Sequence, residues 1–154
     1  MSSGGMFELT TARQLLEKAE HDLARLRASP LDAYAAFDLF VTARHIPEWL
    51  FPDDDSKSQA LFKQHVELRI CRHIADGAKH FVAKDKRHHQ VKGTAKTDSA
   101  WGSAWGNSWG ASWGKRALVI NLDPSVADTT TLGSQISATD LGEKVLKVLK
   151  KVVP

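Results

Sequence analysis

The stretch KSQALFKQHVELRICRHIADGAKHFVA, residues 57–83, decides the fold because its apolar residues recur with helical spacing. At about 100° per residue, four ionisable side chains fall within roughly 60° of one another on one side, with His65 at their edge. These four residues, called the polar stripe below, are Arg69, His73, Asp76 and His80. The other half of the helix is apolar, so we predict one mostly buried helix over residues 57–83 with an ionisable row beside the core.

Two helices are predicted before this stretch. Thr11 and Gln14 form a capping box at the start of a helix over residues 12–28, which carries one apolar stripe. A second helix is predicted over residues 31–45, with its aromatic residues toward the core, and Pro47 closes it or bends it.

Further capping signals place the other helix starts. Asp55 or Ser56 is expected to cap the helix over residues 57–83, following the acidic run before it. A last helix begins near Ala138, where Ser137 and Asp140 form its cap, and its outer face is rich in lysine.

One strand pair is predicted between the last two helices. Residues 117–122, ALVINL, have the composition of a strand, and the Asp-Pro-Ser that follows is typical of a turn. Residues 129–132 are predicted to form the return strand. Residues 84–99 are polar and basic, which is typical of a solvated loop.

The predicted fold class is therefore mainly α: a four-helix, largely antiparallel bundle with a small β-hairpin inserted before the last helix. We expect a flexible N-terminus at residues 1–10 and a single helical domain over residues 11–154, in which 84–116 form a basic loop with a Trp–Gly repeat and 117–132 form the hairpin. With 154 residues, the chain is long enough for a real core. The predicted core includes Leu16, Leu23, Phe37, Phe40, Val41, Ile70, Ile74, Phe81, Leu141, Val145 and Leu149.

Composition excludes some classes of protein. No apolar run approaches the roughly 18 residues that a membrane span requires, and the N-terminus lacks a charged start followed by an apolar block. The single cysteine, Cys71, cannot form an internal disulfide and falls on the apolar face, where a buried, unreactive thiol is expected. We expect a cytoplasmic protein with no cofactor and no metal.

The net charge of +3 conceals a strong asymmetry along the chain. Residues 1–56 contain five Lys/Arg and ten Asp/Glu, whereas residues 57–96 contain ten Lys/Arg, three Asp/Glu and five of the seven histidines. An acidic segment followed by a basic one suggests either self-complementary packing, including a homodimer, or an anionic partner such as RNA.

The Trp–Gly repeat at residues 99–114 has a tryptophan every four residues, each followed by glycine. One interpretation is a variable loop that grew by duplication and lays its indoles over the hairpin or bundle. The other is a platform on which unpaired bases stack between flanking cations. The residues predicted to bind nucleic acid are Lys84, Lys86, Arg87, Lys92, Trp101, Trp105, Trp109 and Trp113.

Three interpretations of the polar stripe remain open. Asp76 can bond His73 or His80 on one helix face, which gives a structural network. A metal would need further ligands such as His45 or Glu48, because His73 and His80 are about 10 Å apart. A catalytic site would use a histidine as general acid/base and Arg69 to stabilise an anion, which suffices for RNA cleavage without a metal.

Parts of the chain resemble a family of small bacterial proteins of uncharacterised activity. The segments FVTARHIPEWL (40–50), LRICRHIADGAKHF (68–81) and SATDLGEKVL (137–146) are similar to that family's "HLPDW", "ICxHIANGAKHF" and "ISALDLA" segments. The helical layout also loosely resembles HEPN domains, which are helical bundles found in toxin and phage-defence ribonucleases. Their signature is an arginine followed after four to six residues by a histidine, whereas Arg69 and His73 have three residues between them.

Two functions follow as hypotheses. The first is a helical-bundle module that binds a partner or has a structural role. The alternative is a metal-independent RNA-directed nuclease, or a nucleic-acid-binding protein, of a toxin or phage-defence system. In that case the resemblance implies that Arg69, His73 and His80 act on the RNA, with Asp76 orienting one imidazole.

Overall fold

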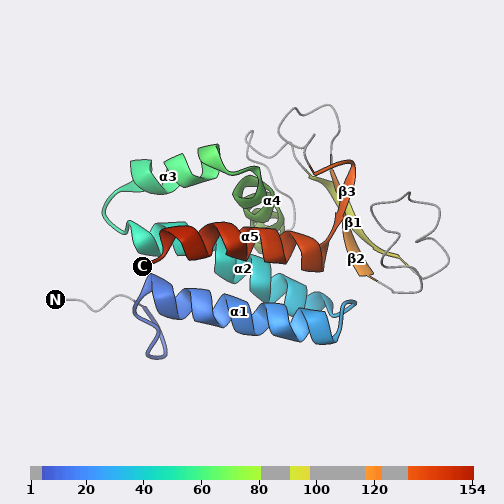
Figure 1. Ribbon diagram of the computed structural model, residues 1–154, viewed down its shortest axis with the longest axis horizontal. Helices are drawn as coiled ribbons and strands as arrows, with labels where there is room; N and C mark the ends of the chain where they lie inside the picture. The colour runs from blue at the N-terminus through green and yellow to red at the C-terminus, as the bar shows by residue number, and fades with distance from the viewer. Residues whose placement is uncertain (1–4, 81–90, 98–116, 123–131) are drawn as a thin grey trace.

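The computed structural model describes residues 5–80, 91–97, 117–122 and 132–154, and these form five helices and one three-stranded sheet. In chain order the elements are α1 (Ala12–Ala28), α2 (Ala33–Leu50), α3 (Asp55–Gln64), α4 (Val66–His80), β1 (Val91–Thr97), β2 (Ala117–Leu122), β3 (Gln135–Ser137) and α5 (Ala138–Val152). The strands are antiparallel in the order β1-β2-β3. The prediction of a mainly α fold with a small antiparallel β unit before the last helix is confirmed (Figure 1).

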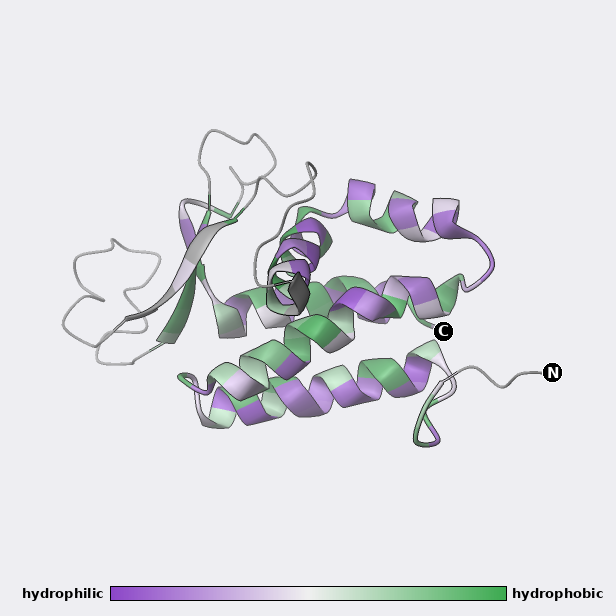
Figure 2. Cartoon of the chain, turned by 180° about the vertical axis from the view of Figure 1, so that it is seen from behind, coloured by the Kyte–Doolittle hydropathy of each residue, from purple (hydrophilic) through white to green (hydrophobic). Residues whose placement is uncertain are grey.

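The helix α2 is the centre of the fold. It packs against α1, α3, α4 and α5, and Figure 2 shows hydrophobic residues concentrated along it. The sheet lies at one end of the helices, and the C-terminus lies at the other end (Figure 1). Side chains from all these helices and from β2 form one apolar core, whose largest fully buried members include Leu16, Leu26, Leu39, Ile46, Phe62, Leu68, Ile70, Leu122, Leu141, Leu146 and Leu149.

Two predicted helix caps are confirmed and one is wrong by a residue. The Oγ1 of Thr11 accepts from the backbone N–H of Gln14, whose side chain accepts in return, and the Oγ of Ser137 accepts from the N–H of Asp140 at 3.0 Å. The cap of α3 is Asp54 instead of Asp55 or Ser56. The hydroxyl of Ser56, at 2.6 Å, and the N–H of Lys57 donate to its carboxylate, and they hold the pKa of Asp54 below its ordinary value.

The single helix predicted over residues 57–83 is wrong: His65, at φ −129° and ψ 110°, divides it into α3 and α4. The physical reason lies in the buried faces. On one continuous helix, the side that α3 buries, with Leu61 and Phe62, would be rotated by roughly 100° from the side that α4 buries, with Leu68 and Cys71. One extended residue lets both faces reach the same core.

The helix α2 continues beyond the predicted end at His45 and includes Pro47. Pro47 removes one backbone donor, but the residues after it, Trp49, Leu50 and Phe51, pack against the core. That packing stabilises a further turn of helix which the proline alone disfavours.

Two aromatic residues expected in the core lie at the surface. Tyr34 and Phe37 are 82% and 50% exposed, so the prediction of Phe37 as a core residue is wrong. Val41 and Ile74, also predicted core residues, are only partly buried. Phe37, Val41 and Ile74 line the cavity between α2, α4 and the sheet that is described below.

The basic stretch predicted as a solvated loop contains a strand, which corrects that prediction. The strand β1 pairs with β2 from Val91 opposite Leu122 to Thr97 opposite Ala117, with an irregularity next to Val91. Thr94 and Ala95 supply little apolar character, so the alternation that marks a strand is weak here. The predicted strand at 117–122 is confirmed as β2, and β3 pairs with its other edge.

Several predictions fall outside the described residues. They concern Phe81, the strand residues 129–131, the N-terminal residues 1–4, and the proposed nucleic-acid contacts at Lys84, Lys86, Arg87, Trp101, Trp105, Trp109 and Trp113. Within the described part of the chain, none of the helices combines the length and the apolar character needed to cross a membrane.

Candidate functional site

Arg69 of the polar stripe joins α4 to the end of α3. Its Nη1 donates to the backbone carbonyls of Phe62 at 2.8 Å and Lys63 at 2.6 Å. These carbonyls belong to the last turn of α3, where intrahelical donors run out and the helix dipole is negative. Arg69 therefore stabilises the break at His65 by capping the helix that ends there.

Asp76 of the polar stripe joins α4 to α2. Its Oδ1 accepts from Nε of Arg44 at 3.3 Å, and Nη1 of Arg44 also donates to Glu48 at 2.8 Å. The Arg44 guanidinium lies 5.6 Å from the centre of the Phe62 ring and is only 15% exposed. This is a half-buried charge network between helices, and the part played by Arg44 was not predicted from the sequence.

His73 of the polar stripe joins α4 to the sheet. Its Nδ1 accepts from the backbone N–H of Val91 at 3.3 Å, at the first residue of β1. An accepting Nδ1 requires the proton of the neutral ring to be on Nε2. His80 is the last residue of α4, and its side chain, like that of Lys92 on β1, is outside the described set.

The described contacts of these three residues thus reach α3, α2 and β1 in turn. Such a pattern is what a structural network produces, and the catalytic role stays a prediction. Among the residues that the structure describes, no three His, Cys, Asp or Glu side chains are grouped so that they could hold a metal ion. His45 and Glu48, the suggested extra ligands, contact each other at 3.4 Å.

Cys71 is buried, as predicted. Its Sγ donates to the carbonyl of Phe40 at 3.4 Å, and burial raises the pKa of the thiol to about 12. A thiol with that pKa is almost entirely protonated near neutral pH, and the thiolate is the nucleophilic form. Cys71 is therefore a packing residue in the interface between α2 and α4.

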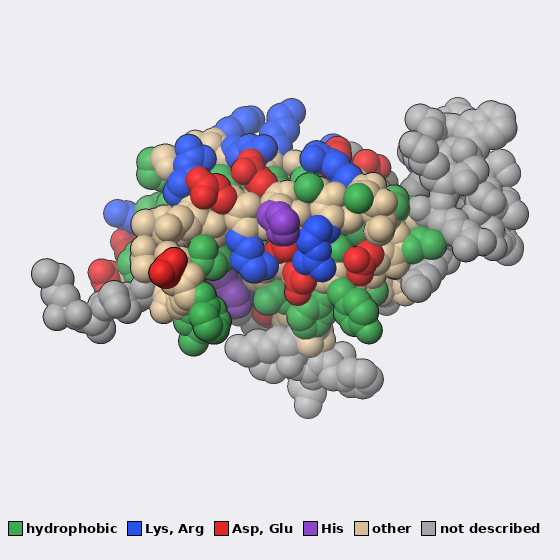
Figure 3. Space-filling model, turned by 90° about the horizontal axis from the view of Figure 1, so that it is seen from below, with side chains coloured by type: hydrophobic (Ala, Val, Ile, Leu, Met, Phe, Trp, Pro, Cys, Tyr) green, Lys and Arg blue, Asp and Glu red, His purple; other side chains and the backbone are tan. Residues whose placement is uncertain are grey.

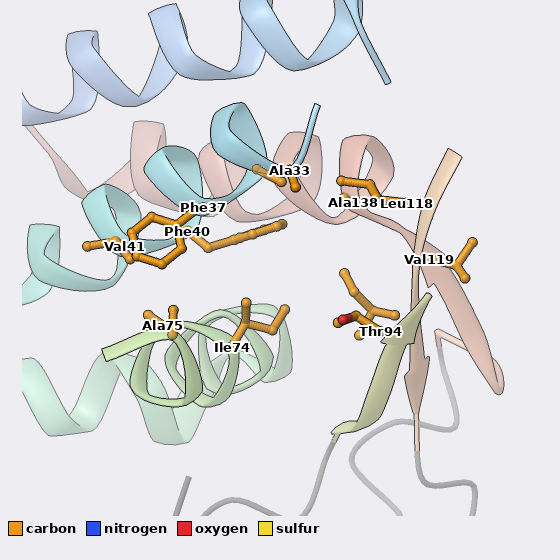
Figure 4. A pocket seen from close by; sticks show the side chains of 13 residues that line it. Ala33, Phe37, Phe40, Val41, Ile74, Ala75, Thr94, Leu118, Val119 and Ala138 are labelled. Carbon is orange, nitrogen blue, oxygen red and sulfur yellow. The ribbon is translucent and has the colours of Figure 1, made fainter. Parts of the chain in front are cut away.

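An apolar cavity that sequence analysis missed, called the α2–α4 pocket below, is the feature with binding character. It has a volume of about 390 Å³ and opens to the surface between α2, α4, the sheet and the start of α5. Figure 4 shows Phe40 of α2 facing Ile74 and Ala75 of α4, with Thr94 at the sheet end. The lining residues are Ala33, Ala36, Phe37, Phe40, Val41, Ile74, Ala75, Ala78, Thr94, Leu118, Val119, Ile120 and Ala138.

The chemistry of the α2–α4 pocket is almost wholly apolar. Among the lining residues that the structure describes, Thr94 alone has a polar side chain and none is charged. Phe37 lines the pocket while half exposed, and Tyr34 lies one turn before it on α2. The signal in the sequence was the run AYAAFDLFV at residues 33–41, in which small and aromatic residues alternate on one helix face.

No family model, curated protein or solved structure matches the chain.

Proposed function

We propose that this protein is a binding module that receives apolar side chains of a protein partner in the α2–α4 pocket. The observation that carries the proposal is an open cavity of about 390 Å³ whose described lining residues are apolar except for Thr94. Binding pockets in proteins are usually of this size and character, and they add a few polar groups to orient a small ligand.

The lining favours a protein partner over a polar small molecule. In the described part of the wall Thr94 is the only polar side chain, so these residues offer little means to orient a ligand by hydrogen bonds. Beside it, Tyr34 and Phe37 project from α2 with 82% and 50% of their surface exposed. Exposed aromatic residues beside a pocket are typical of the centre of a protein interface.

The contacts of the polar stripe support a binding module in preference to an enzyme. Arg69 caps α3, Asp76 accepts from Arg44, and His73 accepts from Val91, so each has a role in the fold. On the face seen from below in Figure 3, acidic and basic side chains are interspersed instead of forming a patch of one sign. The RNA-directed alternative and the HEPN likeness stay predictions, tested by cleavage of single-stranded RNA.

A neutral fluorophore tests whether the α2–α4 pocket accepts apolar groups. N-phenyl-1-naphthylamine should bind the full chain with saturable enhancement of its fluorescence. Ala78→Leu should greatly reduce that binding, because Ala78 lines the pocket and is only partly buried, so the larger side chain has room to enter it. The matched control is Ala24→Leu, an exposed alanine of α1 outside the pocket. Equal binding by both variants would refute the site.

Photo-crosslinking tests the identity of the partner. A benzoylphenylalanine placed at position 37 should give a crosslinked product in cells of the source organism, and Ala78→Leu in the same chain should remove it. The same crosslinker at position 24 should give none. An adduct of twice the mass of the chain would identify a second copy as the partner, and no adduct at position 37 would contradict the proposal.

A further inference from the structure

The strand β1 forms one edge of the sheet. In the described part of the chain the strand order is β1-β2-β3, so β1 pairs with β2 on one side and with no strand on the other. In an antiparallel ladder, successive residues direct their backbone N–H and C=O groups to opposite sides of the strand. Every second residue of β1 therefore directs both groups away from β2. Such an edge is a template to which another extended chain can add.

The hydrogen bonds of β2 identify the outward residues of β1. The N–H of Leu122 donates to the carbonyl of Ser134, on the β3 side of β2, at 2.8 Å. Ile120, two residues earlier on β2, faces the same side. Thr94 lies directly opposite Ile120, so its backbone groups point away from β2. The backbone groups of Lys96, two residues further along β1, point the same way.

This outward edge of β1 adjoins the α2–α4 pocket. The N–H of Val91 donates to Nδ1 of His73 on α4 at 3.3 Å, so the edge is turned toward α4 where the strand begins. Further along, Thr94 is exposed and lies across the pocket from Ile74 and Ala75 of α4 (Figure 4). Within the described residues, no group is hydrogen-bonded to the outward N–H and C=O of Thr94. The apolar pocket therefore borders a stretch of unpaired backbone.

We propose that the α2–α4 pocket and the β1 edge together bind an extended peptide segment of a protein partner, which adds to the sheet beside β1. This binding mode rests on the proposed function and defines the conformation of the partner. Directly opposed residues in a sheet have their side chains on the same face, so the partner residue opposite Thr94 directs its side chain into the pocket. Backbone hydrogen bonds give affinity, and the pocket selects apolar residues at alternate positions.

An extended segment fits this site better than a helix or a second copy of the chain. A helix satisfies its own backbone groups and would leave the edge of β1 unpaired. The sequence of β1, VKGTAKT, contains one large apolar residue, Val91. A second copy that paired through its own β1 would therefore bring too few apolar side chains to fill a pocket of about 390 Å³.

The test is NMR titration of the full, ¹⁵N-labelled chain with the peptide acetyl-Lys-Val-Thr-Leu-Thr-Val-Glu-amide, whose apolar residues occupy alternate positions. Saturable binding should shift the amide signal of Thr94 and slow its hydrogen exchange, because this N–H gains an acceptor. No saturable binding at millimolar concentration, or binding that leaves the Thr94 amide signal unchanged, would overturn the proposal.

Two methylated forms of the peptide test the backbone pairing. In an antiparallel complex the backbone of the leucine faces β1, whereas that of each threonine faces away. N-methylation of the leucine should then weaken binding at least about fivefold, and N-methylation of the threonine after it is the matched control. A parallel complex would show the reverse order. Equal affinity of the two methylated peptides would overturn strand addition.

Thr94→Pro removes the outward donor on the protein. The variant should bind the unmethylated peptide at least about fivefold more weakly than Thr94→Val, which changes the same side chain but keeps the N–H. Proline is accepted on an edge strand where its nitrogen faces away from the ladder, and cooperative urea unfolding checks that both variants fold. Equal affinity of two folded variants would contradict the proposal. If Thr94→Pro does not fold, the methylated peptides decide.

N-phenyl-1-naphthylamine separates failure of this binding mode from failure of the proposed function. If the fluorophore binds in the α2–α4 pocket but the peptide does not bind, strand addition is wrong and the apolar role of the pocket stands. If neither binds, the proposed function fails as well.

Discussion

Replacing Arg69 by methionine separates a structural role of the polar stripe from a catalytic one. Methionine keeps an unbranched apolar stem but removes both hydrogen bonds from Nη1 to the carbonyls of Phe62 and Lys63, at 2.8 and 2.6 Å. A hydrogen bond from a charged group contributes roughly 1.5–3 kcal/mol. The two bonds share one nitrogen, and Lys63 is exposed enough for water to reach its carbonyl. We therefore expect a total loss of about 2 kcal/mol.

Urea denaturation followed by circular dichroism at 222 nm measures this loss. For a denaturant slope of 1–3 kcal/mol per molar, a loss of about 2 kcal/mol lowers the midpoint by roughly 1 M. The control is Arg13→Met, at an exposed position in the first turn of α1, for which a change within about 0.5 kcal/mol is expected.

The refuting result is specific. If the free energy of unfolding of Arg69→Met lies within about 0.5 kcal/mol of that of the parent, the capping role of Arg69 is wrong. If the parent also cleaves single-stranded RNA and Arg69→Met abolishes the cleavage at unchanged stability, the polar stripe is catalytic and the binding-module account fails.

Three further substitutions or titrations test the packing. Gly142→Ala should destabilise the protein by about 1 kcal/mol, because its new Cβ would lie 2.7 Å from a methyl group of Leu39, a fully buried side chain. Overpacking costs roughly 1–3 kcal/mol, which exceeds the gain of about 1 kcal/mol in helix propensity. A rise in the urea midpoint would contradict this. Ser137→Ala should cost about 1 kcal/mol in the same assay through loss of the cap bond to Asp140, and no change would show that the cap is dispensable. Cys71 should resist Ellman's reagent at pH 8 until urea unfolds the chain. The pKa of the Cys71 thiol is about 12 in the folded protein against 9.0 ordinarily, so the unfolded chain releases this proton at lower pH. The free energy of unfolding should therefore fall as the pH rises from 9 toward 12, and it should fall by more than in Cys71→Ala. An equal pH dependence of stability in the two proteins would contradict the burial of the thiol.

Local sequence signals predicted much of the fold. The bounds of α1, the start of α5 at Ala138 and the strand β2 follow from capping residues and from apolar periodicity, which act within a few residues. The break at His65 could not be found in this way. The break arises because α3 and α4 must present differently oriented faces to one core. The end of α3 is capped by Arg69, which lies a full turn into the next helix.

The candidate site was less predictable for a related reason. The positions of Arg69, His73 and Asp76 on one helix face followed from spacing, but the described partners, such as Arg44 and the N–H of Val91, come from other elements. The α2–α4 pocket is a gap between α2, α4 and the sheet, and periodicity reports which residues are apolar without reporting how well their layers fill space. For the same reason Phe37, apolar and in helical register, was expected in the core.

The central claim is that the α2–α4 pocket receives apolar groups, and methyl NMR of the full chain tests it most directly. On titration with N-phenyl-1-naphthylamine, the methyl signals of Ile74, Ala75 and Ile120, which line the pocket, should shift in a saturable manner. Those of Ile46 and Val145, fully buried in the core and outside the pocket lining, should not move. Pocket methyl signals that stay unchanged at saturating probe, or that shift no more than those of Ile46 and Val145, would contradict the account.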